Sequence, residues 1–348
     1  MRPEPLVHPP AAPTTPAATA VAHPNIALVK YWGKRDERLV LPRVDSLSLT
    51  LGVFPTTTTV ALAPGTAHDR VTLDGAPAEG EALRRVVAFL DLVRDRAGIA
   101  HRAVVESENT VPTGAGLASS ASGFAALAAA AAAAYGLRLD AAGLSRLARR
   151  GSGSACRSVF GGFAVWHAGR DRADPAEADL ASYAEPVAVG DLDPALVVAV
   201  VDAGPKPVSS RAAMRHTVDT SPLYEPWAVS SRADLTEMRA ALLAGDIEAV
   251  GRVAERNALG MHATMLAARP AVRYLSPATL TVLDAVLRLR GDGVPAYATM
   301  DAGPNVKVLC RRPDADRVAE AVRAAAPGSR VLVAGPGPGV RLLDGDGR

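Results

Sequence analysis

The sequence predicts an α+β protein built from two domains. Its 348 residues are about twice the length of a usual single domain. Strand-like stretches with alternating or β-branched apolar residues recur between stretches of helical periodicity. The pattern is weakest over residues 174–193, so the boundary is predicted near residue 190, with an N-terminal domain over 21–190 and a C-terminal domain over 191–340.

The N-terminal domain begins with short strands. Residues 1–20 are rich in Pro, Ala and Thr and show no periodicity, which predicts a mobile tail. Strands are then predicted over residues 26–31, 46–53, 56–62 and 102–107. Between the last two, apolar residues spaced three and four apart predict an amphipathic helix over 79–97.

A helix of small residues is predicted to end at Gly136. Alanine has the highest helix propensity, and a glycine suits the left-handed residue that ends a helix. Because alanine side chains are short, this helix should pack very close to its neighbours. Asp140 is the expected N-cap of a further helix through Arg150, which is followed by a Ser/Gly turn and a strand.

The C-terminal domain is predicted to carry strands and helices in the α+β pattern. The strands are expected over 196–201, 296–300, 306–310 and 330–333, and the helices over 233–244, 247–265, 277–289 and 315–325. The Gly335 to Gly339 stretch, in which Gly and Pro alternate, is predicted to be only a turn. Residues 341–348 are predicted to form a flexible tail.

Charge and composition exclude several classes of function. Lys and Arg number 38 against 36 Asp and Glu, so a strong general nucleic-acid or membrane field is not expected. Cys156 and Cys310 have no metal-ligand spacing, and the histidines form no zinc motif, so no metal-ligating residues are predicted. No membrane span or signal peptide is recognised, which predicts a cytoplasmic protein with reduced cysteines.

The clearest motif is a glycine-rich turn that runs into serines at the start of the small-residue helix. Backbone N–H groups can approach an anion closely at glycines, and a helix N-terminus adds positive potential. The motif is not a Walker A loop, because no lysine follows Gly116. A phosphate site is therefore favoured, with a helix entry needed only for packing as the alternative. The residues of this turn are Pro112, Gly114, Ala115, Gly116, Leu117, Ala118, Ser119 and Ser120.

Three further clusters carry donors that suit an anionic substrate. Residues 25–36 hold Lys30, Tyr31 and Lys34 around a glycine, although either lysine taken alone is more often a solvated surface charge. Residues 152–157 and 208–211 each pair serine hydroxyls with an arginine, and guanidinium groups bind carboxylates or phosphates bidentately. Serine-rich turns near an arginine are also common caps.

Asp301 is the candidate acidic group. It follows an apolar strand and precedes a Gly-Pro turn, a place where a side chain can face a cleft. The alternative is an aspartate that only caps a turn. A cation nearby would keep this carboxylate ionised, and Arg157 and Lys34 are the expected candidates.

Together these segments resemble the diphosphomevalonate decarboxylase family of the small-molecule (GHMP) kinase superfamily. The motifs that carry the resemblance run in order from NIALVKYWGKRDERLVLP through DSLSLTL, ENTVPTGAGLASSASG, RRGSGSACRSVFGGF and SSRAAMRHTVDTSPLY to MDAGPN. The resemblance implies an N-terminal domain like ribosomal protein S5 and a ferredoxin-like C-terminal domain, with the active site between them. One departure is Arg43-Val44-Asp45-Ser46, where the family commonly has Asn-Ser-Ser after Leu-Pro; Asp45 is expected to cap a turn.

The same resemblance implies an enzyme that decarboxylates mevalonate 5-diphosphate with ATP and Mg²⁺, giving isopentenyl diphosphate, ADP, phosphate and carbon dioxide. Asp301 would orient or deprotonate the 3-hydroxyl group, with Arg157 and Lys34 beside it, and residues 114–120 would hold the ATP phosphates. The residues implied in substrate binding are Asn25, Tyr31, Lys34, Ser154, Arg157, Ser210 and Arg211.

Several alternatives and partners stay open. The alternatives are a mevalonate 3-kinase, a phosphomevalonate decarboxylase and a non-catalytic anion-binding protein. A small-molecule substrate is the expected partner, with no nucleic acid and no membrane, and family members are often homodimers.

Overall fold

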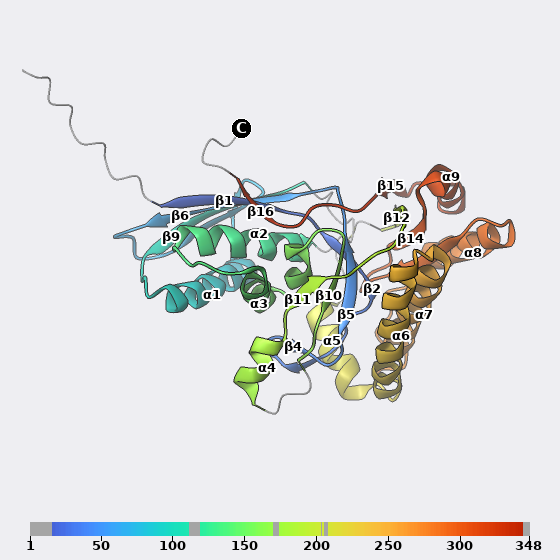
Figure 1. Ribbon diagram of the computed structural model, residues 1–348, viewed down its shortest axis with the longest axis horizontal. Coiled ribbons are helices and arrows are strands. Elements are labelled where there is room, and N and C mark those ends of the chain that lie inside the picture. Colours follow the sequence, from blue (N-terminus) through green and yellow to red (C-terminus); the bar gives the residue numbers. More distant parts are fainter. Residues whose placement is uncertain (1–15, 111–118, 170–173, 203, 205–207, 344–348) are drawn as a thin grey trace, which may run out of the picture.

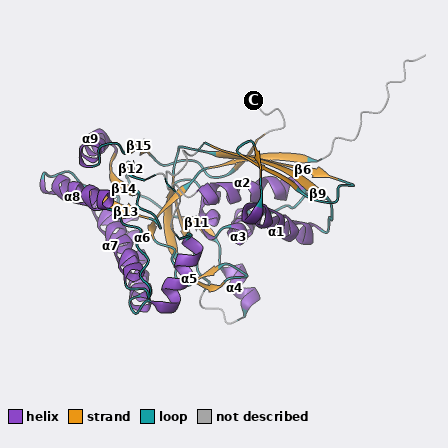
Figure 2. Ribbon diagram, turned by 180° about the vertical axis from the view of Figure 1, so that it is seen from behind, coloured by secondary structure: helices purple, strands orange, loops and turns teal. Residues whose placement is uncertain are grey.

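A computed structural model describes residues 16–110, 119–169, 174–202, 204 and 208–343, and it consists of two lobes that lie side by side (Figure 1). The first lobe is built on a six-stranded sheet with the order β16-β1-β6-β9-β7-β8, in which only the β7–β9 pair is parallel. Its strands are β1 (Ala17–Ala22), β6 (Thr56–Ala63), β7 (Arg70–Leu73), β8 (Ala76–Pro77), β9 (Arg102–Asn109) and β16 (Arg341–Leu343). Helices α1 (Gly80–Ala97), α2 (Ser119–Ala134) and α3 (Ala141–Gly151) cover one face of this sheet (Figure 2).

The small-residue helix is the centre of the first lobe, as its composition predicted. Nearly every residue of α2 from Ala121 onward is buried, and the helix packs directly against β1 and β6. Larger side chains in this core come from α1, such as Phe89 and Leu90. The predicted N-cap of α3 is also present, because the Asp140 side chain accepts a hydrogen bond from the Gly143 N–H.

Two four-stranded sheets complete the fold: one lies between the lobes, and the other forms the sheet of the second lobe (Figure 1). One has the order β11-β10-β5-β2 and the other the order β13-β14-β12-β15. Their strands are β2 (Asn25–Val29), β5 (Ser46–Thr50), β10 (Phe163–Trp166), β11 (Ala184–Pro186), β12 (Pro194–Val200), β13 (Ala296–Met300), β14 (Val306–Arg311) and β15 (Arg330–Ala334). Leu28 and Leu49 of the first of these sheets share one hydrophobic cluster with Leu196 of the second. The two lobes therefore have a continuous core between them.

Helices cover both faces of the β13-β14-β12-β15 sheet. Helices α6 (Tyr224–Ala244) and α7 (Ile247–Leu266) pack on the face shared with β2 and β5, while α8 (Pro277–Gly291) and α9 (Ala315–Ala325) pack on the other. Smaller elements complete the chain: the β3 (Lys34–Asp36) and β4 (Leu41–Pro42) hairpin, α4 (Pro175–Ala181), α5 (Ser210–Thr220) and the 3-10 helices η1 (Gly153–Val159) and η2 (Arg312–Asp314). No helix in the described ranges combines the length and apolarity needed to cross a membrane.

The predicted tails are shorter than expected. Strand β1 begins at Ala17 and pairs with both β6 and β16, so residues 17–20 belong to the sheet. Residues 341–343, predicted to be flexible, form β16 at the edge of the same sheet. Strand β1 was not predicted because its buried side chains are small. Ala20 and Ala22 are fully buried, but alanine gives only a weak apolar signal. The rest of both predicted tails, residues 1–15 and 344–348, lies outside the described residues.

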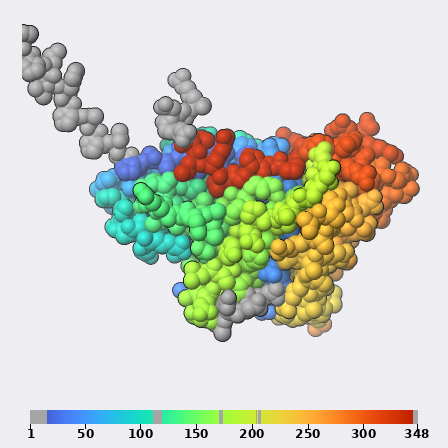
Figure 3. Space-filling view, viewed as in Figure 1, coloured from blue at the N-terminus to red at the C-terminus, as the bar shows by residue number. Residues whose placement is uncertain are grey.

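The Gly-Pro stretch before β16 is more than a turn. The Gly337 N–H donates to the Thr50 carbonyl at 2.8 Å, and the Gly337 carbonyl accepts from Gly162 N–H at 2.9 Å. This segment, residues 335–340, runs from the second lobe back along the first, where Figure 3 shows the C-terminal residues in red over blue and green ones. A Cβ atom on Gly337 would lie 2.3 Å from the Leu51 carbonyl group. Glycine is therefore required for the close backbone approach.

Gly337→Ala is expected to lower the free energy of unfolding by about 1–3 kcal/mol, because the added methyl group must push two backbone segments apart. Chemical denaturation measures this change. The matched control is Gly291→Ala at the end of α8, where an added Cβ meets nothing within 4 Å. Equal losses in the two variants would contradict the packing argument.

Candidate active site

Asp301 lies between two buried lysines. It follows β13 directly, and Lys30 follows β2 directly, so the ends of two strands bring these side chains together. The Lys30 Nζ lies 2.8 Å from Asp301 Oδ1, and the Lys307 Nζ lies 3.3 Å from Asp301 Oδ2. Both lysine residues are 1% exposed. Each carboxylate oxygen therefore has its own ammonium group.

These lysines determine the charge state of Asp301. Burial alone would raise the pKa of the Asp301 carboxyl, but Lys30 and Lys307 together lower that pKa well below its ordinary value. Burial in turn lowers the pKa of Lys30, against the raising effect of Asp301. Asp301 is thus an ionised carboxylate at neutral pH, as the sequence analysis required of it.

The cation assigned to Asp301 from the sequence was partly wrong. Lys34 lies on β3 and pairs with Glu37, while the other lysine of the motif, Lys30, contacts Asp301. The signal for Lys30 was its place at the end of five consecutive buried residues, since a lysine there is unlikely to be a simple surface charge. Lys307, which stands among the buried apolar residues of β14, was not predicted as a partner of Asp301.

His262 is a further buried neighbour of this group that sequence reasoning missed. It lies on α7, is 2% exposed, and Lys30 and Asp301 both affect its pKa. Burial and the charge of Lys30 lower its pKa to about 4, so the ring is neutral at pH 7. His262 therefore adds no charge to the site.

Arg157 is a buried cation held by neutral acceptors. Its Nε donates to Ser48 Oγ at 2.9 Å, its Nη1 to Ser46 Oγ at 2.6 Å and its Nη2 to Asn25 Oδ1 at 3.2 Å. The two serines are two residues apart on β5, so both point to the same face of the sheet. Burial lowers the pKa of Arg157, and the charge of Asp301 acts in the opposite direction. Arg157 is therefore within electrostatic range of Asp301, although the groups that chiefly lower the pKa of Asp301 are Lys30 and Lys307.

Asn25 and Ser154 are tied into the framework of the site. The Asn25 Nδ2 donates to the Ser154 carbonyl at 3.0 Å and to Ser158 Oγ at 2.8 Å, while its Oδ1 accepts from Arg157. Asn25 therefore orients the η1 segment and the guanidinium of Arg157. Asp45, expected to cap the turn that follows it, instead makes a long-range contact: its Oδ1 accepts a hydrogen bond from the Ala168 N–H at 2.6 Å, just after β10.

Tyr31 lies against the start of η1, where a Cβ on Gly153 would be 2.9 Å from its ring. The Tyr31 ring packs edge-on against Trp166 at 4.7 Å, and its buried hydroxyl has no hydrogen-bond partner among the described residues. Burial raises the pKa of Tyr31, and the charges of Arg157 and Arg211 act in the opposite direction. An orphaned buried hydroxyl beside two guanidinium groups fits an anionic ligand. Ser210 opens α5 next to Arg211, and both come from a helix that the sequence analysis did not predict.

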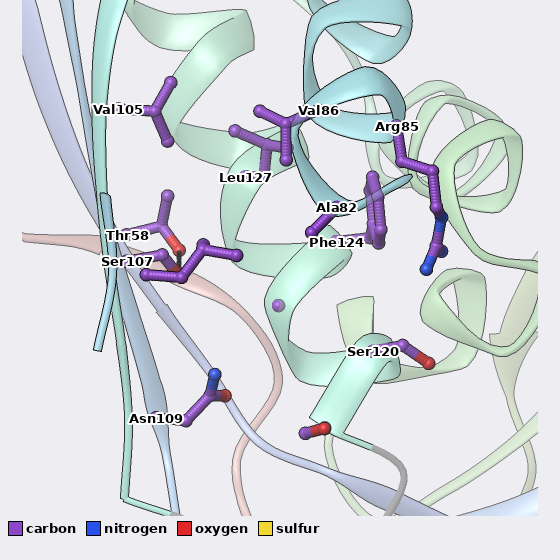
Figure 4. Close-up of a pocket in the computed structure, with 13 residues that line it drawn as sticks. Thr58, Ala82, Arg85, Val86, Val105, Ser107, Asn109, Ser120, Phe124 and Leu127 are labelled. Carbon is purple, nitrogen blue, oxygen red and sulfur yellow. Dashed lines mark hydrogen bonds between the residues drawn. The ribbon is translucent and has the colours of Figure 1, made fainter. Parts of the chain in front are cut away.

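Two serines of the glycine-serine turn lie among the described residues. Pro112, Gly114, Ala115, Gly116, Leu117 and Ala118 lie outside the described residues, while Ser119 and Ser120 form the first turn of α2 with exposed side chains. Beside them is a cavity of about 170 Å³ between α1, α2 and the sheet (Figure 4). Its walls include Val86, Val105 and Leu127, and its polar groups include Asn109 and Arg85.

One backbone carbonyl, that of Gly151, accepts hydrogen bonds from an arginine of this cavity and from Arg211. Arg85 lies over the Phe124 ring at 4.8 Å and donates to the Gly151 carbonyl at 3.2 Å. Arg211 donates to the same carbonyl at 3.3 Å. The two arginines come from α1 and α5, so both lobes contribute to a cationic surface at this point. Among the residues with described positions, no group of three or more His, Cys, Asp or Glu side chains could hold a metal ion.

Two family models match the chain. The model of the diphosphomevalonate decarboxylase-like N-terminal domain matches residues 22–178, and that of the mevalonate 5-diphosphate decarboxylase C-terminal domain matches residues 196–333. The phosphomevalonate decarboxylase of Haloferax volcanii is 36% identical over 310 residues, which are 88% of this chain and 91% of the relative.

Solved structures agree with these matches. The mevalonate diphosphate decarboxylase of Staphylococcus aureus superimposes with a TM-score of 0.90 at 40% identity, over 95% of this chain and 99% of the other. A complex described as MDDEF with MVAPP, AMPPCP and magnesium superimposes with a TM-score of 0.89 at 43% identity, over 95% of this chain and 100% of the other. Their two-domain architecture is the one described above. The chain therefore belongs to the diphosphomevalonate decarboxylase family.

Proposed function

We propose that this site carries out the ATP-dependent decarboxylation of mevalonate 5-diphosphate, with Asp301 facing the 3-hydroxyl group of the substrate. The observation that carries the proposal is the ionised Asp301 carboxylate between Lys30 and Lys307, with the buried guanidinium of Arg157 in electrostatic reach. Lys30, Lys307 and Arg157 carry more positive charge than Asp301 neutralises. A substrate with a carboxylate and a diphosphate supplies the missing negative charge. The MDDEF complex with MVAPP, AMPPCP and magnesium supports the choice of substrates.

Asp301 first acts by orientation. A carboxylate with a strongly lowered pKa is a weak base, so Asp301 accepts a hydrogen bond from the 3-hydroxyl and takes its proton late, as that oxygen bonds to the γ-phosphorus of ATP. The bond from that phosphorus to the bridging oxygen breaks in the same step, and ADP leaves with its electron pair. Phosphate then leaves with the electron pair of its C–O bond. The electrons of the bond to the carboxylate form the double bond of isopentenyl diphosphate, and carbon dioxide is released. Arg157 is placed to orient that carboxylate.

The nucleotide is assigned to the cavity beside α2. Its apolar walls suit a base, while the Ser119 and Ser120 hydroxyls and the Arg85 guanidinium suit phosphates. Magnesium bound with ATP neutralises charge on the transferring phosphoryl group. The 112–118 segment remains a predicted part of this phosphate site, and the cytoplasmic setting and the homodimer also remain predictions.

The test is a substrate panel. The protein is incubated with ATP and either mevalonate, its 5-phosphate or its 5-diphosphate, and ADP and carbon dioxide are measured together. Equal amounts of ADP and carbon dioxide, with the 5-diphosphate preferred, support the proposal. ADP without carbon dioxide would indicate a 3-kinase, and no ADP with any of the three would indicate a non-catalytic protein.

The Haloferax volcanii relative makes the 5-phosphate the main competing substrate. The two candidates differ only in the terminal phosphate, so the residues that bind it decide the preference. Arg211 is placed for this contact, because it is exposed and lies near the buried Tyr31 hydroxyl. A higher kcat/KM with the 5-phosphate in the substrate panel would assign the chain to the competing reaction.

Arg211→Ala is expected to raise the KM for the 5-diphosphate by more than about tenfold and the KM for ATP by less, because the lost guanidinium contacts the substrate side of the site. Steady-state kinetics with each substrate varied in turn provide the measurement. Arg215→Ala, on an exposed position of the same helix, is the matched control. Equal losses for both substrates would instead indicate that α5 is displaced.

A further inference from the structure

Lys307 occupies an unusual position for a lysine. It lies on β14, which is flanked by β13 and β12 within the sheet, and it is paired with Thr299 on one side and Val198 on the other. The residues around it on the strand, Val306 and Val308, are fully buried. Burying an ammonium group is costly unless it is paired, so a specific interaction must hold Lys307 there.

The alternation of the strand directs Lys307 toward Asp301. Val306 and Val308 pack in the cluster under α8 and α9, while Leu309 packs in the cluster under α6 and α7. Lys307 is two residues from Leu309 and shares its face of the sheet. That face leads to the end of β2, where Lys30 is located. The alternation of β14 therefore points Lys307 toward Asp301, so their ion pair does not depend on a mobile surface side chain.

Lys30 and Lys307 contact different oxygens of the Asp301 carboxylate. Lys30 holds Oδ1 at 2.8 Å and Lys307 holds Oδ2 at 3.3 Å. With only one of these ammonium groups, the carboxylate could rotate about its bond to Cβ. The contact of Lys307 is an ion pair, since Oδ2 has no hydrogen-bond partner among the described residues. With both ammonium groups present, the orientation of the carboxylate is restrained before any substrate binds, which is the pre-organisation that phosphoryl transfer requires of a protein.

We propose that Lys307 is a positioning residue for the reaction, which acts through Asp301 by restraining the orientation of its carboxylate. This inference rests on the proposed function. The other charged or titratable groups that face Asp301 are Lys30 from the end of β2, Arg157 from η1 and the neutral His262 from α7. Loss of Lys307 leaves Lys30 and Arg157 in place, so Asp301 becomes easier to protonate but stays ionised at neutral pH.

The first test is the steady-state kinetics of Lys307→Met and Lys307→Arg. Lys307→Met is expected to lower kcat at pH 7 by about tenfold to a hundredfold with less than a threefold change in either KM, because a disordered carboxylate affects the chemical step. The acid limb of its kcat profile should move to higher pH, since a lost cation favours the protonated form of Asp301. Lys307→Arg keeps the charge and should restore the position of that limb.

The second test separates this role from a merely structural one. In an Asp301→Asn background, Lys307→Met should change the residual kcat by less than about twofold, because its effect passes through the carboxylate. Full additivity of the two changes, or an acid limb that does not move in Lys307→Met, would overturn the proposal. Thermal unfolding of each variant identifies any that fail to fold. If Lys307→Met does not fold, the kinetics of Lys307→Arg are compared with those of the wild type instead.

A third measurement does not depend on turnover. A ¹³C NMR titration of the Asp301 carboxyl reports its pKa in the wild type and in Lys307→Met. A rise of that pKa in the variant is expected even if the wild type proves inactive on every mevalonate derivative, in which case only the proposed function fails. An unchanged Asp301 pKa would count against Lys307.

Discussion

Asp301→Asn is expected to reduce kcat by at least about a thousandfold while nucleotide binding is retained. The substitution keeps the shape of the side chain but removes the group that accepts the hydroxyl proton. It also turns an amide NH₂ toward one of two ammonium groups, Lys30 or Lys307, neither of which can accept a hydrogen bond. The measurements are kcat from carbon dioxide release and the dissociation constant of ATP from calorimetry.

The control for Asp301→Asn is Asp316→Asn, an exposed carboxylate in the first turn of α9. Its kcat should stay within about twofold of the wild type, since surface changes away from special features have small effects. If Asp301→Asn retained more than a tenth of the wild-type kcat, Asp301 could not have the role assigned to it.

Arg157→Met is expected to weaken binding of the 5-diphosphate by about 30-fold to a thousandfold, which corresponds to the loss of a buried charged contact of about 2–4 kcal/mol. Arg157 is a cation with three neutral acceptors, and no carboxylate among the described residues lies within 4 Å of it in an ion pair. A buried guanidinium without a carboxylate partner is stabilised when an anion binds beside it, and the substrate carboxylate is that anion. Calorimetric titration with substrate in the absence of ATP measures the loss.

Arg149→Met is the informative comparison, because Arg149 is also fully buried but already pairs with Asp179. Its removal leaves a carboxylate and the Ser182 carbonyl without their donor, so the free energy of unfolding should fall by about 3–5 kcal/mol. Arg157→Met should cost less stability than Arg149→Met while losing far more substrate affinity. The reverse order would mean that Arg157 is a structural residue.

Regular periodicity made most of the fold predictable. The 3.6-residue spacing in α1 and the alanine content of α2 produced helices close to the predicted bounds. Helix α5 was not predicted because its sequence, SRAAMRHTVDT, mixes polar and β-branched residues, and its stability depends on the Ser209 cap and on packing of Ala213 and Met214. Tertiary contacts of that kind have no local signal.

The motifs that hold the candidate site residues could be predicted from the sequence, but the pairs of side chains that contact each other could not. Asp301 and Arg157 were identified by their place at strand and turn ends, and the structure brings them together. Whether Lys30 or Lys34 would face Asp301 depended on how β2 ends, which residue spacing alone does not determine. Lys307 was missed because one lysine in an apolar strand leaves the local pattern nearly unchanged, and only the position of β14 beside β13 reveals its partner.

The pairing of β16 with β1 has a consequence for biosynthesis. Strand β1 leaves the ribosome long before residues 341–343, which form its outer neighbour. During translation the first lobe therefore exposes an unprotected strand edge, which is a template for association with other nascent chains. A nascent chain halted before residue 341 should accordingly depend more on chaperones than the full-length polypeptide does.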